Sequence, residues 1–275
     1  MSKNNKYFMV GSDPEGFLFD NSGKLVSSLG VIPGDKHSPH KTTNGYVLPD
    51  NITAEFNSIP ASNVEDFVRN HNLILRDLDD IIKPLNLNMT FIASVMASDD
   101  ILSDERAREA GCSIDFNAWS MSINEVADYS NTSLRAAGGH LHISFDQSEN
   151  QEVDNRIKFV RALDLVLGVP SILVDDDIDR RKCYGKAGSF RPKFKDGSDP
   201  YNGVEYRTLS NFWVRSEGLM RWAFNGVKKV YDNLDDLSMR AESISEEIIN
   251  CINNSDKKAA IHICNQMEIE YYATN

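Results

Sequence analysis

The fold is best worked out from one stretch, Leu134-Arg-Ala-Ala-Gly-Gly-His-Leu-His-Ile-Ser-Phe145. After the two glycines, apolar and polar residues alternate, which is the two-residue period of a β-strand with one apolar face. His140 and His142 therefore project from the same side, about 7 Å apart. Gly138 and Gly139 carry no side chains, so a bulky group can come close to the backbone there. An isolated His-x-His more often marks an edge strand with solvated histidines, so the interpretation depends on the rest of the chain.

Three other segments carry polar side chains at the same two-residue spacing. They are Asp13 with Glu15, Glu55 with Asn57, and Glu205 with Arg207. Strands with one solvated face show such alternation routinely, so each pair alone is weak evidence. If one antiparallel sheet carries all four pairs, its polar face brings carboxylates, imidazoles and a guanidinium together. Crowded carboxylates raise one another's pKa unless a cation neutralises them, which predicts a site for Mg²⁺ or, with an imidazole present, Mn²⁺.

Composition is typical of a globular protein with one sizeable core, or one core with a small appendage. The chain has 275 residues, of which 41% are hydrophobic and 25% charged. The formal net charge of -12 argues against nucleic acid or an anionic membrane as a partner.

The cysteines and the apolar runs indicate a cytoplasmic protein. Cys112, Cys183, Cys251 and Cys264 show no CxxC or zinc-finger spacing, so we expect free thiols in a reducing compartment. Cys112 is the most tempting nucleophile, but a structural role fits it better. Residues 1–7 lack the apolar core of a signal peptide, and the most apolar run, 163–174, is too short to span a bilayer.

Hydrophobic periodicity and turn residues predict the local elements. His71 lies on the apolar stripe of a predicted helix and is expected to pack in the core. The long loop rich in Pro, Gly, Lys and His, residues 32–46, is expected to be functional or mobile. The predicted elements are a hairpin over 17–26, strands over 51–59, 89–96 and 204–209, a helix from a capping box at Ser62 to residue 82, a short helix over 104–109, a long helix from a capping box at Ser148 to about Pro170, a helix over 212–234, and two helices in the tail 235–275.

A polar segment between residues 175 and 202 concentrates positive charge. It contains Arg180, Arg181, Lys182, Lys186, Arg191 and Lys193, together with Gly185 and Gly188. A solvated basic loop, offset by the aspartates at 175–177, is the alternative interpretation. We prefer phosphate binding, because the glycines allow backbone N–H groups to face an anion beside the basic side chains. The chain has no Walker A pattern and no strand–GxGxxG–helix unit, which argues against a P-loop or Rossmann site. Metal-binding carboxylates beside such a loop are the groups that phosphoryl transfer from a nucleotide requires.

These motifs, taken in order, resemble the bacteriophage carboxylate–amine (COOH–NH2) ligases of the glutamine synthetase-like superfamily. The resemblance runs from Gly11 to about Trp213. It rests on residues 11–15, 31–36 with Pro39, 50–57, 111–119, 135–142, Arg180-Arg181, 184–191 and 205–213.

The resemblance implies an α+β fold, in which helices back a curved antiparallel sheet whose concave face holds ATP and two or more Mg²⁺ ions. It implies a ligase domain over 1–234 and a helical extension, 235–275, packed on the same domain. The residues that match metal ligands are Glu15, Glu55, His140 and Glu205, with Asp13 as an extra ligand. Those expected to hold nucleotide are Arg180, Arg181, Lys186, Arg191 and His142. Catalytic roles are implied for Arg207, Arg191 and Glu55. Glutamine synthetases have more paired glutamates than this chain, so Asp50 or Asp115 is left as an unassigned substitute.

The implied reaction is ATP-dependent formation of an amide or peptide bond through an acyl phosphate. The substrates would be a carboxylate and an amine that are small molecules, peptides or protein-linked groups, and an oligomer is left open. Two alternatives remain at this point. One is a phosphotransferase like the guanidino kinases, which are related in fold. The other is a non-catalytic phage or virion-associated protein.

Overall fold

The computed structural model describes residues 7–108, 114–124, 132–145, 152–175, 178–194 and 202–272. Cys112 and the capping box expected at residues 148–151 lie outside these ranges. Of the helices within them, none combines the length and the apolar character needed to cross a membrane.

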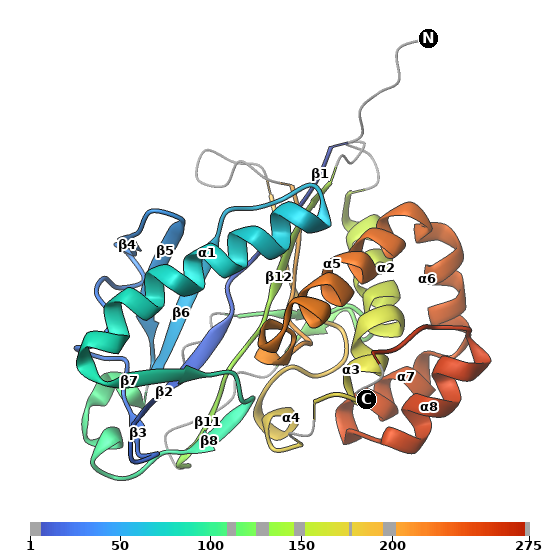
Figure 1. Ribbon diagram of the computed structural model, residues 1–275. Helices are drawn as coiled ribbons and strands as arrows, with labels where there is room; N and C mark the ends of the chain where they lie inside the picture. The colour runs from blue at the N-terminus through green and yellow to red at the C-terminus, as the bar shows by residue number, and fades with distance from the viewer. Residues whose placement is uncertain are drawn as a thin grey trace.

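Two antiparallel six-stranded sheets form the framework (Figure 1). The first has the strand order β1-β12-β14-β13-β9-β10, and the second runs β3-β2-β6-β5-β4 with β7 paired to β2. Strands β8 and β11 form a separate two-stranded sheet. The bounds are β1 Phe8–Ser12, β2 Glu15–Asp20, β3 Leu25–Val26, β4 His40–Lys41, β5 Gly45–Asp50, β6 Thr53–Ser58, β7 Leu87–Thr90, β8 Ser94–Met96, β9 Phe116–Asn117, β10 Ser122–Ile123, β11 Leu134–Ala136, β12 Leu141–Phe145, β13 Ser189–Lys193 and β14 Gly203–Tyr206.

The two large sheets meet at a two-residue connection, Asp13-Pro14, between β1 and β2. On each side of this connection, backbone hydrogen bonds link a strand of one sheet to a segment that adjoins a strand of the other. Val10 exchanges two hydrogen bonds with Ala61, and the N–H of Glu15 donates to the carbonyl of Gly138 at 3.0 Å. The polar pairs expected on one sheet are therefore divided between two sheets that share an edge region.

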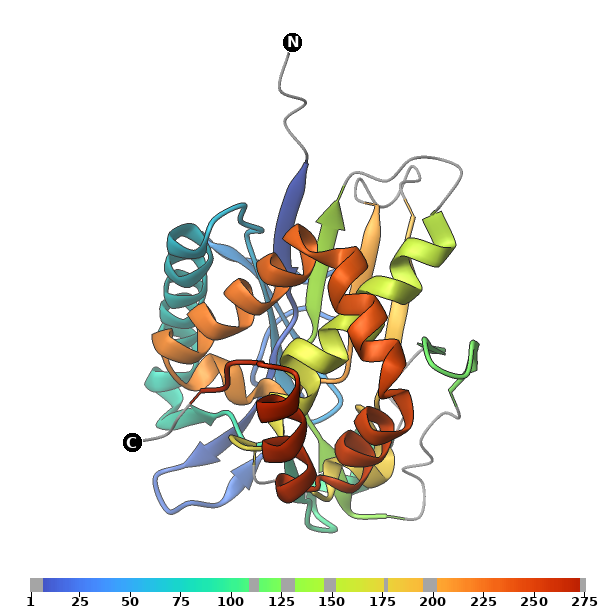
Figure 2. The ribbon, with the colours of Figure 1, turned by 90° about the vertical axis from the view of Figure 1, so that its right-hand side faces the viewer.

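Helices cover these sheets on one side, and the last helices of the chain pack together beside α2 and α3 (Figures 1 and 2). Helix α1 lies across β5 and β6, and α2 packs against β13 and β14. The bounds are α1 Val64–Ile82, α2 Glu152–Leu163, α3 Val169–Ser171, α4 Arg180–Cys183, α5 Glu217–Asp232, α6 Leu234–Ser243, α7 Ser245–Asn254 and α8 Lys257–Gln266. The expected α+β class, antiparallel sheet backed by helices, is confirmed.

One hydrophobic cluster runs from the sheets into the tail. It includes Phe56 and Val204 from the strands and Leu237, Ile252 and Ile263 from the last three helices. A second, smaller cluster surrounds Phe17 and Ile52. The tail thus contributes its apolar side chains to the main core.

Several local predictions are confirmed, and some boundaries were wrong. His71 is fully buried, as expected, and its Nε2 atom lies 2.7 Å from the hydroxyl of Ser12. Helix α1 is capped by Asn63 instead of Ser62. The strand expected over 89–96 is two strands, β7 and β8, and the tail as far as residue 272 contains three helices instead of two.

The long helix ends close to the predicted position, at Ser171, but it is not α-helical throughout. A π-helical turn, Asp164–Gly168, joins α2 to α3 and carries the chain to Ser171. Such turns commonly occur at functional sites. Pro170 lies in α3, directly after this wider turn.

Candidate active site

Cross-strand pairing places three of the expected residues in one row of the first sheet. His142 lies opposite Glu205 between β12 and β14, and Glu205 lies opposite Arg191 between β14 and β13. Directly opposed residues share a face of an antiparallel sheet, so these side chains are neighbours. In the second sheet, Glu15 of β2 lies opposite Glu55 of β6.

The glycine pair before β12 lets the chain pass close to its neighbours, as the sequence indicates. A Cβ atom at Gly139 would lie 2.2 Å from the carbonyl oxygen of Ser210, and one at Gly138 would lie 2.4 Å from Nε2 of His140. Neither position therefore tolerates a side chain in this arrangement.

The first ligand cluster forms around Asp13. Its Oδ1 atom lies 3.2 Å from Nδ1 of His140, and its Oδ2 atom lies 3.2 Å from Nε2 of His142. Nδ1 of His140 is also 3.7 Å from Oε1 of Glu205. Asp13, His142 and Glu205 each offer one ligand atom within 4.8 Å of the others, which is close enough for a shared metal ion.

The second ligand cluster consists of Glu15, Asp50 and Glu55, again with ligand atoms within 4.8 Å of one another. Burial and the neighbouring Asp50 raise the pKa of Glu15 to about 8. Burial, with Asp13 and Asp50 nearby, raises the pKa of Glu55 well above its usual value. Carboxylates in this state favour a cation among them, because a positive charge would relieve their mutual repulsion.

In the first cluster the pKa values of the carboxylates are lowered instead of raised. Burial acts to raise the pKa of Asp13, but His142 and His140 hold it well below its usual value. The pKa of Glu205 is also lowered, because His142, Arg207 and His140 outweigh burial and the charge of Asp13. Burial and the nearby Arg207 lower the pKa of His140, which favours the neutral imidazole that can ligate a metal.

All three residues of the second cluster line one cavity of about 350 Å³, and Asp13 of the first cluster lines it together with its neighbour His140. Its lining combines residues of both sheets with the long loop that follows β3. The lining residues are Asp13, Glu15, Lys36, Pro39, Leu48, Asp50, Glu55, Asn57, His140, Arg191 and Arg207. Segments far apart in the sequence therefore bring four of the predicted ligand residues, Asp13, Glu15, Glu55 and His140, to one cavity, and the fifth, Glu205, lies 3.7 Å from His140.

Two arginines lie beside Glu205 on this wall. Arg207 forms an ion pair with Glu205 and is 2% exposed, and its Nε atom lies 3.4 Å from Oδ2 of Asp115. Arg191 lies 3.4 Å from Oε1 of Glu205 and is less buried. Both guanidinium groups are positioned to neutralise an anion in the cavity.

Tyr184 is a site residue that the sequence analysis missed. Its hydroxyl lies 2.8 Å from Nε2 of His140, and the guanidinium of Arg207 lies 5.2 Å from the centre of its ring. Because Nδ1 of His140 faces the Asp13 carboxylate, a neutral ring that keeps its proton on Nδ1 accepts the Tyr184 O–H at Nε2. Tyr184 thereby fixes the orientation of this histidine. No periodicity marks Tyr184, since it lies in a turn.

The cationic segment divides into buried and accessible residues. Arg180 is 1% exposed and donates to the carbonyl oxygens of Ala137, Thr208 and Leu209 at 2.7 to 3.0 Å. Arg181 is 4% exposed and donates to the carbonyl oxygens of Gly185 and Thr208. Phosphate binding by these two arginines stays a prediction, and the hydrogen bonds given above are all with the main chain.

Backbone N–H groups of the turn at Gly185–Gly188 also bond to other parts of the protein. The N–H of Gly188 donates to Oδ2 of Asp164 at 2.6 Å, and the N–H of Ala187 donates to Asn253 of the tail at 2.8 Å. These two donors therefore face the protein's own acceptors instead of an external anion. Gly185 adopts φ +69, and a Cβ there would meet the guanidinium of Arg180.

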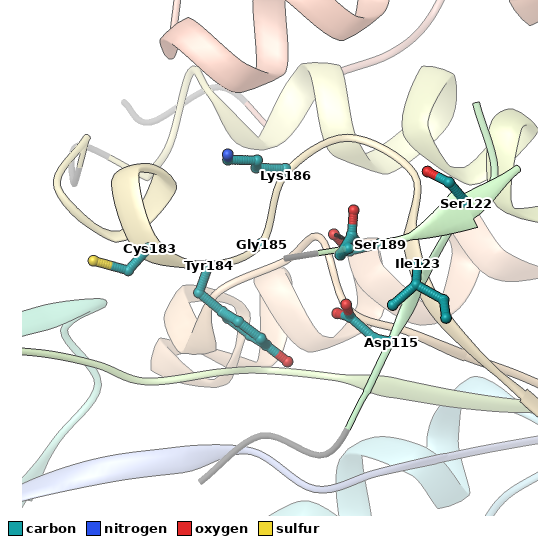
Figure 3. A pocket seen from close by; sticks show the side chains of 9 residues that line it. Asp115, Ser122, Ile123, Cys183, Tyr184, Gly185, Lys186 and Ser189 are labelled. Atoms are coloured by element: carbon teal, nitrogen blue, oxygen red, sulfur yellow. Dashed lines mark hydrogen bonds between the residues drawn. The ribbon is translucent and has the colours of Figure 1, made fainter. Parts of the chain in front are cut away.

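Lys186 is exposed and lines a second cavity, of about 310 Å³ (Figure 3). Tyr184 and Lys186 leave the turn on different sides, while Asp115 and Ser189 lie across from them (Figure 3). The full lining is Asp115, Ser122, Ile123, Asn124, Cys183, Tyr184, Gly185, Lys186 and Ser189. Tyr184 connects this cavity to the first, since its hydroxyl contacts His140.

Lys36 is a further residue that the sequence analysis left without a role. Its Nζ atom lies 2.8 Å from Oδ1 of Asp50, within the second ligand cluster. The sequence feature that could have indicated Lys36 is its position in a long loop rich in glycine and proline. Asp50, left unassigned from the sequence, is a full member of this cluster.

Residues 117–273, more than half of the chain, match a family model described as phage phiEco32-like COOH.NH2 ligase-type 2. This match starts and ends later than the resemblance noted in the sequence, so it includes the tail but not the segments with Asp13 and Glu55. No curated protein matches the chain.

Solved structures similar to the chain include "Apo GmaS without ligand", with 12% identity and a TM-score of 0.43, over 96% of this chain and 69% of that one. They also include a bifunctional glutathione synthetase from Pasteurella multocida, with 11% identity and a TM-score of 0.44. The match covers 95% of this chain and 49% of the synthetase, so the chain spans about half of that protein's length.

Proposed function

Because the chain belongs to the phage phiEco32-like COOH.NH2 ligase-type 2 family, we propose that it joins a carboxylate to an amine at the expense of ATP. The observation that supports this most directly is one cavity lined by the whole Glu15–Asp50–Glu55 cluster, by Asp13 of the other cluster, and by Arg191 and Arg207. Phosphoryl transfer depends chiefly on positioning and charge neutralisation, and such a cavity provides both.

Divalent metal ions fit the donor set. Carboxylate oxygens with one or two imidazoles suit Mg²⁺ or Mn²⁺. Within the described part of the chain, Oδ1 of Asp13, Nδ1 of His140 and Nε2 of His142 are buried without a hydrogen-bond partner. They take part in ion-pair contacts of 3.2 Å around Asp13, which a metal ion would replace. Asp13, His140, His142 and Glu205 would hold one ion, and Glu15, Asp50 and Glu55 a second. When bound, the ions would neutralise charge on the nucleotide phosphates.

The protein's own residues would act mainly by orienting the reactants. Arg207 and Arg191 would contact the phosphoryl group as it moves from ATP to the substrate carboxylate, which forms an acyl phosphate and ADP. The amine then attacks the acyl carbon, and phosphate leaves. Arg207 is held in place by Glu205 and Asp115, so it loses little freedom when it binds the anion.

The second cavity is the proposed nucleotide site. Lys186 would contact the nucleotide phosphates from its rim, and His142 would approach them from the first sheet. Arg180 and Arg181 would fix the backbone around this site, because they donate hydrogen bonds to the carbonyl oxygens of the turn and of residues 207–209. Glu55 is proposed to act both as a ligand and in the catalytic step.

The substrates are proposed to be a carboxylate and an amine on small molecules, peptides or proteins, in the cytoplasm of a phage-infected host. The acidic net charge of -12 is the reason to propose that nucleic acid is not a partner.

The decisive experiment is to incubate the protein with Mg-ATP and a panel of amines and carboxylates, and to measure phosphate release and product mass. We expect ADP, phosphate and an amide. Glu205→Ala and His140→Ala are each expected to abolish turnover and to leave the circular dichroism spectrum unchanged. Full turnover in both variants would contradict the site assignment. A phosphorylated amine without free phosphate would instead indicate a phosphotransferase. If Mg-ATP failed to raise the melting temperature, a non-catalytic role would be favoured.

A further inference from the structure

The feature that the proposed chemistry does not explain is a lysine placed over a ligand cluster. Nζ of Lys36 lies 2.8 Å from Oδ1 of Asp50, whose side chain is 15% exposed, whereas that of Lys36 is 46% exposed. Asp50 shares its cluster with Glu15 and Glu55. The ammonium group therefore enters the cavity at the position where three carboxylates converge.

Lys36 is presented by a tight turn and not by a loose loop. Asp35 and Ser38 exchange two backbone hydrogen bonds, and the side chain of Asp35 accepts the N–H groups of His37 and Ser38 at 2.8 and 2.9 Å. Gly34 adopts φ +90, and a Cβ atom there would lie 2.5 Å from the backbone nitrogen of His40. Glycine is thus required at the base of this turn, which fixes the stem of Lys36.

The two ligand clusters differ in how their charge is balanced. Around Asp13 and Glu205, two histidines and two arginines supply positive charge. At Glu15, Asp50 and Glu55, the ion pair found among the described residues is the one with Lys36. An ammonium ion and a divalent ion cannot both occupy the centre of such a cluster, because like charges repel at this distance.

We propose that Lys36 is a tethered cation that occupies the Glu15–Asp50–Glu55 cluster before a metal ion arrives and must leave when the ion binds. Lys36 would thereby keep the empty cluster stable and set the metal concentration at which the site fills. Metal binding would release the turn at residues 34–39 from the cavity wall. This inference rests on the proposed function, because it takes the cluster to be a metal site.

The test is a titration of the metal-free protein with Mn²⁺, followed by calorimetry and by the electron paramagnetic resonance signal of free Mn²⁺. Lys36→Met removes the charge and keeps the stem, so we expect one class of sites to bind Mn²⁺ about fivefold more tightly, as loss of a half-exposed ion pair would allow. Lys36→Arg keeps the charge and should bind like the unmodified protein. Lys41→Met, on the neighbouring β4, is the matched control and should change nothing.

A second measurement uses thermal unfolding. Without metal, Lys36→Met should melt below the unmodified protein, because Asp50 loses the ammonium group that pairs with it. With saturating Mn²⁺ the two melting temperatures should coincide. Equal Mn²⁺ affinity in Lys36→Met and the unmodified protein would overturn this inference alone, and weaker binding would show that Lys36 supports the ion. Absence of Mn²⁺ binding in every protein would instead overturn the metal assignment on which the proposed function depends.

Discussion

At the scale of single residues, Tyr184 shows how one hydroxyl can set the state of the site. It contacts Nε2 of His140, while the other ring nitrogen faces Asp13. If Nδ1 binds a metal ion, the ring proton must reside on Nε2, and the hydroxyl oxygen of Tyr184 then accepts a hydrogen bond from this N–H. Partners of this kind commonly contribute 10- to 100-fold in metal affinity or activity.

We therefore expect Tyr184→Phe to weaken Mn²⁺ binding about 10-fold and to lower ATP-dependent phosphate release. The melting temperature should stay close to that of the unmodified protein, because the ring and its packing remain. Tyr46→Phe, at an exposed tyrosine, is the control. Unchanged Mn²⁺ affinity in Tyr184→Phe would show that the hydroxyl does not orient His140.

The raised pKa of Glu15 has a consequence for stability. Because burial raises that pKa from 4.5 to about 8, the folded protein binds more protons than the unfolded chain between these values. The stability of the metal-free protein should therefore fall as the pH rises from about 5 to about 8. Urea unfolding at several pH values should show a loss of at least about 1.4 kcal/mol, the equivalent of one pKa unit.

Glu15→Gln should flatten this pH dependence, since an amide does not ionise. Glu246→Gln, at an exposed position of α7, should leave it unchanged. A stability that increases over the same pH range would mean that Glu15 is not held in its protonated form.

At the scale of elements, the π-helical turn after α2 connects several segments of the site through the side chain of Asp164. Asp164 is fully buried, and its carboxylate accepts hydrogen bonds from Trp119, Tyr206, Gly188 and Thr208 at 2.6 to 3.1 Å. Burial raises its pKa to about 6, although all four bonds act in the opposite direction. This one side chain joins the helix to β14 and to the turn that carries Lys186.

We expect Asp164→Asn to lower the free energy of unfolding by about 2 kcal/mol, because the new amide N–H₂ would face groups that are themselves donors. Chemical denaturation checks this value. Asp232→Asn, at the exposed end of α5, should change it by less than about 0.5 kcal/mol. A similar small change in Asp164→Asn would mean that the observed bonds are not important for stability.

The sequence predicted the strand residues of the site better than its loop residues. Period-two alternation puts His140 with His142, and Glu205 with Arg207, in phase, and the sheets then bring these segments together. Lys36 and Tyr184 lie in turns, where side-chain direction depends on tertiary contacts that no period encodes. The division into two sheets was missed for a similar reason, because alternation is identical in one sheet and in two.

At the scale of the whole molecule, the tail is part of the main core. Ile252 of α7 is fully buried, and a Cβ at Gly168 of the π-helical turn would lie 2.8 Å from its Cδ1 atom. The tail therefore contacts the element that holds Asp164. We propose, in line with this contact, that residues 1–234 and 235–275 unfold together.

Ile252→Ala should cost about 2–4 kcal/mol, the usual range for a buried isoleucine truncated to alanine. Tryptophan fluorescence and far-ultraviolet circular dichroism should shift together in urea, since Trp213 lies in the same core. Ile261→Ala, at a 45% exposed site on α8, is the control. Two separate transitions would show that the tail unfolds independently.

The connection between β1 and β2 has one more consequence. Only Asp13 and Pro14 separate the last residue of one sheet from Glu15, the first residue of the other. Proline restricts its own φ angle and the conformation of the residue before it, so this dipeptide has few shapes available. The distance between the two proposed metal sites is therefore set largely by this dipeptide. Inserting a single residue here could leave both sheets and both ligand clusters intact and still place the clusters at a distance that the proposed nucleotide could not span.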